Sequence, residues 1–295
     1  MRFAEKLKNL RKQAGMSQEK LAEKLNVSRQ AVTKWETETG LPDIENVMAI
    51  SAMFDISVDE LLSDEKEIKV KDDYLFESVT EYDIDGRKDF DMKFGGAKRI
   101  VLSGYDGEKL RVRLVSNTLS TLQNDFKIRI DDIKSRIDIE ARRRNGVTEA
   151  IAKEAVTAFI MIPEQYIRKI ELEVIAQTVE LYALKCDSIE LDIKTQNLIL
   201  ENVIGTVEVN CNLDMNIFCG SLSGNICINQ ISATSKISVP DGAVFSAVRK
   251  GIKTSISYEK NRKAAEAFDS PNADNTIELN GMKSELIIST YKKEV

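Results

Sequence analysis

The sequence contains no histidine among its 295 residues. This removes the side chain used most often as a general base near neutral pH, and a common metal ligand. Four cysteines are present, but no two of them form a CxxC pair, so neither a zinc site nor, in a cytoplasmic chain, a disulfide framework is expected. Since no catalytic motif is found either, we predict no enzyme activity, no catalytic residues, no metal and no cofactor.

Long apolar runs are also missing. No run approaches the roughly 18–20 residues that a membrane helix needs. The N-terminal stretch "MRFAEKLKNLRKQAG" alternates charged and apolar residues and lacks the continuous apolar core of a secretory signal. We therefore expect a cytoplasmic protein that does not contact a membrane.

Charge is distributed unevenly along the N-terminal part of the chain. The net charge of the whole chain is −6, which argues against indiscriminate nucleic-acid binding. Residues 1–35 nevertheless hold nine Lys/Arg and three Asp/Glu, whereas residues 36–62 hold seven Asp/Glu and no Lys/Arg. A small basic surface with an acidic back suits oriented docking on phosphates, and the acidic run is predicted to be a solvated face.

The length and the apolar periodicity predict two domains. Up to residue 62, apolar residues step by three and four, as in helices, and Ser17 and Ser28 are positioned to cap two of them. The range 1–62 is therefore predicted to be a small all-α bundle, and the charged stretch 63–73 a linker. A fourth helix is expected to carry Ile44, Val47, Ile50 and Phe54, and a fifth is expected to begin at Ser57. A dimer contact is expected around Phe54 and Ile56.

Beyond residue 73 the apolar period becomes two, which predicts a large all-β domain over 74–295. Within it, similar segments begin at Ile170, Ile189, Val207 and Ile226, and a second set begins at Val179, Leu198 and Ile217. The first set steps by 19, 18 and 19 residues. Two short strands per repeat predict a β-solenoid-like stack. An antiparallel sandwich with evenly spaced strands is the alternative. Helical exceptions are possible near 148–155 and at 262–268.

Residues 18–37 have the pattern of a helix-turn-helix. The small residue Ala22 fits where two helices pack, and "NVS" fits the tight turn. Apolar residues that would point into the bundle are Leu21, Leu25, Val27, Val32 and Trp35. Polar residues that would face outward are Ser28, Arg29, Gln30, Thr33, Lys34 and Thr37. The helix 28–36 is therefore predicted to lie in the major groove of DNA.

The residue types indicate which side chains read bases. Arg29 can donate two hydrogen bonds to guanine, and Gln30 can pair with adenine in the same bidentate manner. Thr33 can offer its methyl group to thymine, and Lys34 can reach a base or a phosphate. The alternative is that Arg29 and Gln30 form an ordinary solvated helix face next to a core Trp35.

A second group is predicted to position the protein on phosphates. Ser17, Gln18 and Ser28 lie at predicted helix N-termini, where backbone N–H groups bind anions. Thr37 lies at the far end of the predicted reading helix.

These residues also carry a resemblance. "SQEKLA", "VSRQAV", "KWE" and "PDIENV" together make residues 1–62 similar to the helix-turn-helix domain of the XRE family, which includes phage repressors and Cro. One departure is "WETETG", where the family more often has a shorter turn. The resemblance implies binding of double-stranded operator DNA, usually as a homodimer.

The β half resembles the adhesin-like β-repeat domains that bacterial regulators of this kind sometimes carry. The resemblance depends on the repeats at 170–239 and on the tail "NTIELNGMKSELIIS". If the repeat register is right, Cys211 and Cys219 point inward and pack as small core residues. Cys227 then faces outward and Cys186 falls at a turn.

Together these features predict a repressor-like transcriptional regulator that reads a palindromic operator. The β domain would set the oligomeric state, sense an effector or bind a protein partner. Two alternatives stay open: an antitoxin-like or scaffolding protein that acts through protein binding by the β domain, and a small-molecule binder housed in the same domain.

Overall fold

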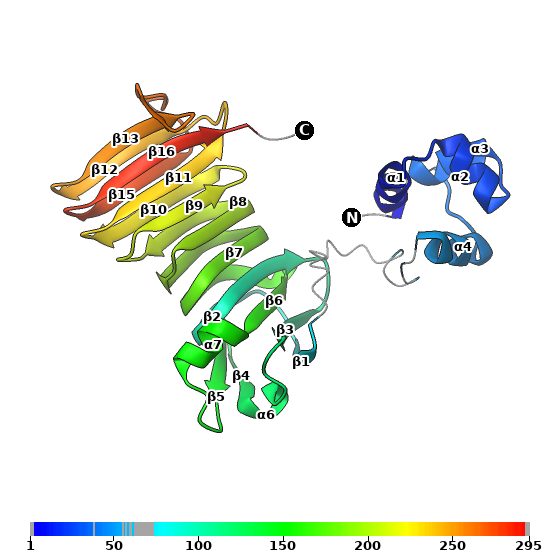
Figure 1. The fold of residues 1–295 in the computed structure, drawn as a ribbon, viewed down its shortest axis with the longest axis horizontal. Coiled ribbons are helices and arrows are strands. Elements are labelled where there is room, and N and C mark those ends of the chain that lie inside the picture. The colour runs from blue at the N-terminus through cyan, green and yellow to red at the C-terminus, as the bar shows by residue number, and fades with distance from the viewer. Residues whose placement is uncertain are drawn as a thin grey trace. The chain divides into compact units, whose positions relative to one another are not determined.

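The computed structural model describes residues 3–37, 39–54, 56, 58, 61 and 74–292. The chain divides into two compact units, Met1–Val70 and Lys71–Val295, which we call the helical unit and the β unit (Figure 1). The predicted linker 63–73 and the predicted helix start at Ser57 lie outside the described residues. The predicted domain limits at residues 62 and 74 stay predictions.

The helical unit contains the expected helices. They are α1 (Phe3–Gln13), α2 (Gln18–Leu25), α3 (Arg29–Glu36) and α4 (Ile44–Phe54). The Ser17 hydroxyl accepts a hydrogen bond from the Lys20 N–H, and the Ser28 hydroxyl accepts one from the Ala31 N–H. Asn26, with φ 54°, ends α2 in the left-handed conformation. The two caps and the left-handed residue set the tight turn that joins α2 to α3.

The four helices pack around one apolar core. Its buried members are Phe3, Leu7, Leu21, Ala22, Leu25, Val32, Trp35, Val47, Ile50 and Leu61. Phe54 and Ile56, predicted at a dimer contact, are partly buried against this core. Ile44 was expected to join the apolar face of its helix, but it is 63% exposed. In α4 the buried residues are Val47 and Ile50, so Ile44 in the first turn lies outside the packed stripe.

The β unit is built from 16 strands joined in one hydrogen-bonded sheet. The strands are β1 (Phe76–Asp83), β2 (Lys88–Tyr105), β3 (Lys109–Ser116), β4 (Phe126–Ile133), β5 (Arg136–Arg143), β6 (Thr157–Pro163), β7 (Ile167–Lys194), β8 (Asn197–Asn210), β9 (Met215–Cys219), β10 (Ser223–Ile231), β11 (Thr234–Pro240), β12 (Ser246–Ile252), β13 (Ser255–Lys260), β14 (Lys263–Ala265), β15 (Thr276–Met282) and β16 (Glu285–Tyr291). Three short helices, α6 (Leu122–Asp125), α7 (Glu149–Ala155) and η1 (Glu164–Tyr166), lie between them. The range 262–268, considered as a helix from its sequence, instead contains β14.

The repeats found in the sequence stack on one another in register. Val207 of β8 pairs with Ile189 of β7 on one side and with Ile226 of β10 on the other, and both pairs are parallel. Leu198 likewise pairs with Val179 and Ile217 in parallel. The alternative of an antiparallel sandwich is therefore wrong for this stretch. The large β-sheet domain is as expected, but the predicted β-solenoid is not confirmed, because the sheet does not close on itself.

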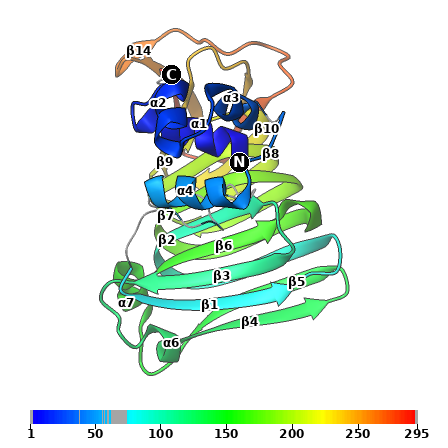
Figure 2. The same cartoon turned by 90° about the vertical axis from the view of Figure 1, so that its right-hand side faces the viewer.

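The last strands of the chain do not lie at the end of the stack. β15 pairs with β10 on one side and with β12 on the other, and β16 lies between β11 and β13 in the same way. β12 and β13 therefore do not pair with β10 and β11, which precede them in the chain. β15 and β16, which come later in the chain, lie between these two pairs of strands. β14 lies at one end of the unit, and β1 and β4 lie at the other (Figure 2).

The cysteines follow the repeat register. Cys211 and Cys219 are buried in the core, as predicted, and Cys227 is half-buried on the outer side. Cys186, predicted at a turn, is also buried. Burial raises the pKa of the Cys219 thiol to about 12 and that of the Cys186 thiol to about 11. Both thiols are therefore poor nucleophiles near neutral pH.

Candidate nucleic-acid interface

Helix α3 has one buried face and one polar face. Val32, Trp35 and Glu36 are buried against the rest of the helical unit. The residues predicted to face outward do so: Ser28, Arg29, Gln30, Lys34 and Thr37 are exposed, and Thr33 is half-buried. The pattern of exposure along the helix has the 3.6-residue period on which the prediction depended. The polar face is therefore continuous from the N-terminus of α3 to its C-terminus.

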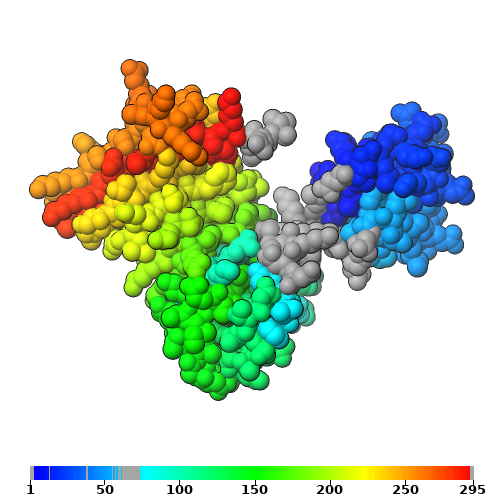
Figure 3. All heavy atoms as spheres, in the orientation of Figure 1, coloured from blue at the N-terminus to red at the C-terminus, as the bar shows by residue number. Residues whose placement is uncertain are grey.

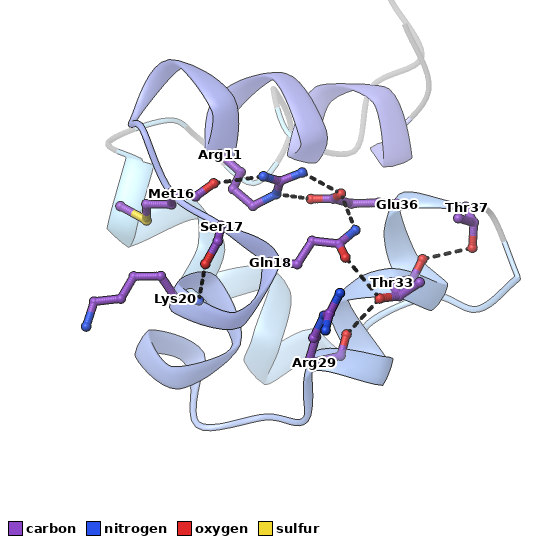
Figure 4. Close-up of polar contacts among 9 residues, drawn as sticks. All are labelled: Arg11, Met16, Ser17, Gln18, Lys20, Arg29, Thr33, Glu36 and Thr37. Atoms are coloured by element: carbon purple, nitrogen blue, oxygen red, sulfur yellow. Dashed lines mark hydrogen bonds and ion pairs between the residues drawn. The ribbon is translucent and has the colours of Figure 1, made fainter.

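A polar network ties α3 to the two preceding helices (Figure 4). The Arg11 guanidinium donates from Nε to Glu36 Oε1 at 2.6 Å and from Nη2 to Glu36 Oε2 at 2.9 Å. Gln18 donates from Nε2 to Glu36 Oε2 at 2.9 Å, and its Oε1 accepts from the Thr33 hydroxyl at 3.2 Å. We call Arg11, Gln18, Thr33 and Glu36 the α3 network. It joins α1, α2 and α3 through their side chains alone.

Glu36 is the centre of the α3 network. Its side chain is 2% exposed and that of Arg11 is 11% exposed. Burial opposes ionisation of Glu36, but the hydrogen bonds from Arg11 and Gln18 outweigh it and hold the pKa of the carboxyl below its usual value. The two-point fork between guanidinium and carboxylate fixes orientation as well as distance.

The burial of Glu36 corrects one prediction. The acidic run 36–62 was interpreted as a solvated face, and this is wrong for its first residue. Glu36 lies on the same face of α3 as Val32, four residues earlier, and therefore turns toward the core. Its partner Arg11 lies 25 residues earlier, so no local spacing reveals the pair. The signal in the sequence is the spacing of four residues from Val32, which places the Glu36 carboxylate on the core face, where it needs a cationic partner.

Several predicted phosphate-contacting side chains already have intramolecular partners. The Ser17 and Ser28 hydroxyls cap helices, and both ends of the Gln18 amide are used within the α3 network. The Thr37 hydroxyl donates to the Thr33 carbonyl at 2.8 Å. These side chains shape the ends of α2 and α3. Any phosphate contact from these residues would use the hydroxyl protons of Ser17 and Ser28, or backbone N–H groups that the caps leave available.

Three predicted base-reading side chains are differently placed. No hydrogen bond or ion pair joins the side chains of Arg29, Gln30 or Lys34 to another described residue. All three are exposed on the polar face of α3, at its N-terminus and one turn later. Their donors are free while the helix that carries them is held in place. Whether they contact DNA stays a prediction.

Within the described ranges, no group of three or more His, Cys, Asp or Glu side chains gathers to hold a metal ion. None of the described helices is long and apolar enough to cross a membrane.

Comparison with known proteins identifies the helical unit. A family model described as helix-turn-helix matches residues 7–61, a range that includes all of the α3 network. The HTH-type transcriptional regulator ImmR of Bacillus subtilis is 31% identical over 46% of this chain and 99% of its own length. The chain belongs to the helix-turn-helix family of transcriptional regulators. Its XRE-type domain is the one expected from the sequence.

Another family member is more similar over a shorter range. The HTH-type transcriptional activator BcrR of Enterococcus faecalis is 48% identical over 66 residues. That alignment covers 22% of this chain and 32% of BcrR. The chain therefore spans about a third of the length of that relative.

The β unit has neighbours among solved structures. A "putative cell adhesion protein" from Clostridium sporogenes aligns with 73% of this chain and 100% of its own, at 13% identity and a TM-score of 0.37. Proteins described as putative adhesins are thus among the solved structures to which this chain is similar. A TM-score this low says nothing about what the β unit binds.

Proposed function

We propose that this helix-turn-helix protein is a sequence-specific DNA-binding regulator of transcription that inserts α3 into the major groove. The observation that carries the proposal is the contrast on α3. Arg29, Gln30 and Lys34 present donors that no other described residue binds on one exposed face, while Glu36 on the opposite face is held by Arg11. A helix that is already held in place loses little conformational entropy when its exposed polar side chains bind a partner.

Each side chain on the polar face has a role in this proposal. Arg29 donates two bonds to guanine O6 and N7, and Gln30 pairs with adenine N6 and N7. Lys34 contacts a base edge or a phosphate one turn along the helix. Thr33 contributes its methyl group to a thymine contact, because its hydroxyl is held by the α3 network.

Phosphate contacts set the register of α3 on the duplex. We assign them to the N-termini of α2 and α3, where Ser17, Gln18 and Ser28 lie, and to Thr37 at the other end of α3. Because these hydroxyls and the Gln18 amide already have protein partners, their main role is to place the backbone N–H groups. The positive end of each helix then faces a phosphate.

A single α3 reads one half-site, so we propose that the protein binds a palindromic operator as a homodimer, in the cytoplasm. Two reading helices would then lie about one helical turn of DNA apart. The β unit would join the two copies or respond to an effector.

Selection of binding sites from a random duplex pool tests the proposal. Full-length protein at physiological salt should enrich one motif, present as an inverted repeat with fixed spacing. A single enriched half-site would support reading by α3 but contradict the dimer. If no sequence is enriched with full-length protein or with the helical unit alone, the proposed reading by α3 is wrong.

A further inference from the structure

Positive charge gathers at the end of the β unit formed by β12, β13 and β14. Residues 249–263 hold six Lys/Arg and one Asp/Glu, in a chain whose net charge is −6. With one cation from the neighbouring turn they form a set that we call the basic edge. It consists of Arg249, Lys250, Lys253, Lys260, Arg262, Lys263 and Lys283. This end is drawn in orange in Figure 3.

The tip of the basic edge is a hairpin with an unfavourable local sequence. Lys260 and Lys263 pair directly across β13 and β14, and like charges placed opposite each other destabilise a strand pair. The turn between them places Asn261 at φ 53° and Arg262 at φ 62°. The left-handed conformation is easy for Asn but costly for Arg. Within the hairpin, these cations stabilise neither the strand pair nor the turn, which suggests that they serve another purpose.

Most of the cations at the basic edge lack a described acidic partner. Lys250 pairs with Glu278 at 2.7 Å, and Lys260 lies 3.6 Å from Asp241. In the part of the chain that the structure describes, no ion pair is formed by Lys253, Arg262, Lys263 or Lys283, and all four are exposed. A cluster of free cations of this kind is the surface that a polyanion binds.

Two of these cations lie in neighbouring turns because β12 and β15 pair with each other. Lys253 lies in the turn after β12 and Lys283 in the turn after β15, with φ 54° and 52°. The Lys283 N–H donates to the Ile252 carbonyl at 2.9 Å, so the two turns are stacked neighbours. The insertion of β15 beside β12 thus brings together two lysines 30 residues apart in the chain.

Strands β7 and β8, which lie beyond β15 and β10 from the basic edge, would repel a polyanion. Glu190 pairs with Glu208 across β7 and β8. Burial, together with the nearby carboxylates of Asp192 and Glu208, raises the pKa of Glu190. A polyanion is therefore attracted at the basic edge and disfavoured along this outer face, which restricts how the β unit can approach it.

We propose that the basic edge is a second, sequence-independent contact of this protein with the DNA backbone, centred on Lys260, Arg262 and Lys263. The inference rests on the proposed function for the identity of the polyanion as duplex DNA. Each Lys or Arg that meets a phosphate releases condensed counterions. The basic edge would therefore add affinity and salt dependence without adding sequence preference, while α3 supplies the sequence preference.

A different role for edge lysines has to be separated from this one. Lysines on exposed edge strands prevent pairing with other chains. β14 is three residues long, and so short an edge already offers little to pair with. Arg262 lies in the turn beyond the last pair of the hairpin, Lys260 with Lys263, where it shields no strand edge.

The test measures how the affinity of the full-length protein for DNA depends on salt. The probe is a mixed-sequence duplex roughly four helical turns long. The variant is K260Q/R262Q/K263Q. The matched control is K127Q/K169Q/K185Q, which removes the same charge from exposed lysines of β4 and β7. If the hairpin contacts two or three phosphates, the negative slope of log affinity against log salt should become shallower by about 2–3 for the first variant. It should not change for the control.

Three results would overturn the proposal. Equal changes in slope for both triple variants would show an effect of overall charge. An unchanged slope combined with aggregation of K260Q/R262Q/K263Q would show edge protection. Binding of the unsubstituted protein to phosphatidylglycerol vesicles that is lost in this variant, with DNA binding unaffected, would show that the polyanion is a membrane surface.

The same assay separates this proposal from the role of α3. Arg29→Ala is measured in parallel on the selected site and on a scrambled site. Loss of sequence preference in Arg29→Ala with no effect of the hairpin variant would leave the reading by α3 intact and reject the basic edge. If the hairpin variant changes the salt dependence but the protein shows no sequence preference, the basic edge is supported and the reading by α3 is rejected.

Discussion

At the scale of single residues, the burial of Glu36 decides how firmly α3 is held. Removing one partner of a buried ion pair leaves an uncompensated charge and costs about 3–5 kcal/mol. We therefore expect Arg11→Met to destabilise the helical unit by roughly that amount. The double variant R11M/E36L removes both charges and should recover most of the loss. Trp35, the sole tryptophan of the chain, lies 6% exposed in the same core, so its fluorescence during urea unfolding reports on this unit.

The matched control for that cycle is Lys20→Met, which breaks the exposed pair of Lys20 with Glu23. An exposed pair contributes less than about 1 kcal/mol, so this variant should unfold nearly as the parent does. If R11M and K20M cost the same, the α3 network does not hold α3 in the manner described.

The lowered pKa of Glu36 also predicts how acid affects the helical unit. A carboxyl whose folded-state pKa lies below its unfolded value contributes stability above the unfolded value of 4.5. That contribution is lost as the pH falls through the folded pKa. Stability followed by Trp35 should therefore decrease below about pH 4.5. In Glu36→Gln this part of the pH dependence should disappear, and a slope equal to that of the parent would assign it to other carboxyls.

Arg29 carries the sharpest prediction about reading. Arg29→Ala should cost about 1–3 kcal/mol on the selected site and relax the preference at one base pair. On scrambled DNA the loss should be smaller, because only electrostatic attraction remains there. Equal weakening on both duplexes would make Arg29 a phosphate contact. The comparison is made with full-length protein at one salt concentration, since affinity for DNA depends steeply on salt.

The residues of the candidate site were predictable to different degrees. Arg29, Gln30 and Lys34 follow from sequence because helical period alone places them outward once Val32 and Trp35 are assigned to the core. The α3 network does not follow, because Arg11 and Glu36 meet only when α1 packs on α3. Gln18 illustrates both cases: its position at a helix start was read correctly, but its two amide hydrogen bonds are tertiary contacts.

At the scale of elements, the close approach of the β10 and β8 backbones near Gly224 restricts which residue can stand there. Gly224 in β10 has φ 117°, and a Cβ there would lie 2.1 Å from the carbonyl oxygen of Gly205 in the adjacent strand. Both a strained backbone and a backbone clash follow, so Gly224→Ala should destabilise the β unit by more than about 1 kcal/mol. Thermal unfolding of the full-length protein, followed by the circular dichroism of the sheet, measures this.

Gly86→Ala is the control for the corner glycine. A Cβ at Gly86 meets nothing within 4 Å, and its φ is outside the left-handed region. It should leave the thermal transition of the sheet nearly unchanged, and the Trp35 signal should not move in either variant. A similar loss in both glycine variants would remove the argument from the stacked corners.

The strand order shows where sequence patterns stop being informative. The repeats beginning at Val207 and Ile226 predicted stacked turns, and the structure pairs these two residues in parallel strands. The return of β15 and β16 to fill the space beside β10 and β11 breaks the correspondence between chain order and spatial order. Spacing cannot reveal this, because each inserted strand has the same period-two pattern as the strands on either side.

At the scale of the whole molecule, the two units make separable contributions to DNA affinity. If the β unit dimerises the protein, a fragment of residues 1–70 should bind a palindromic site more weakly than the full chain, because the second half-site no longer benefits from linkage. On a duplex with a single half-site, the two should differ only by what the β unit itself contributes. Trp35 fluorescence and circular dichroism establish first that the fragment is folded.

The basic edge would also contribute to the difference in affinity between the full-length protein and the fragment. Full-length protein would exceed the fragment on every duplex if the hairpin adds phosphate contacts, even without dimerisation. The variant K260Q/R262Q/K263Q should lose the excess on a single half-site. On the palindrome it should keep the part of the excess that comes from dimerisation, because dimerisation does not depend on those cations. Loss of the excess on both duplexes would mean that the β unit acts through DNA contact alone. An excess on neither duplex, already in the unsubstituted protein, would leave the β unit with no part in DNA binding.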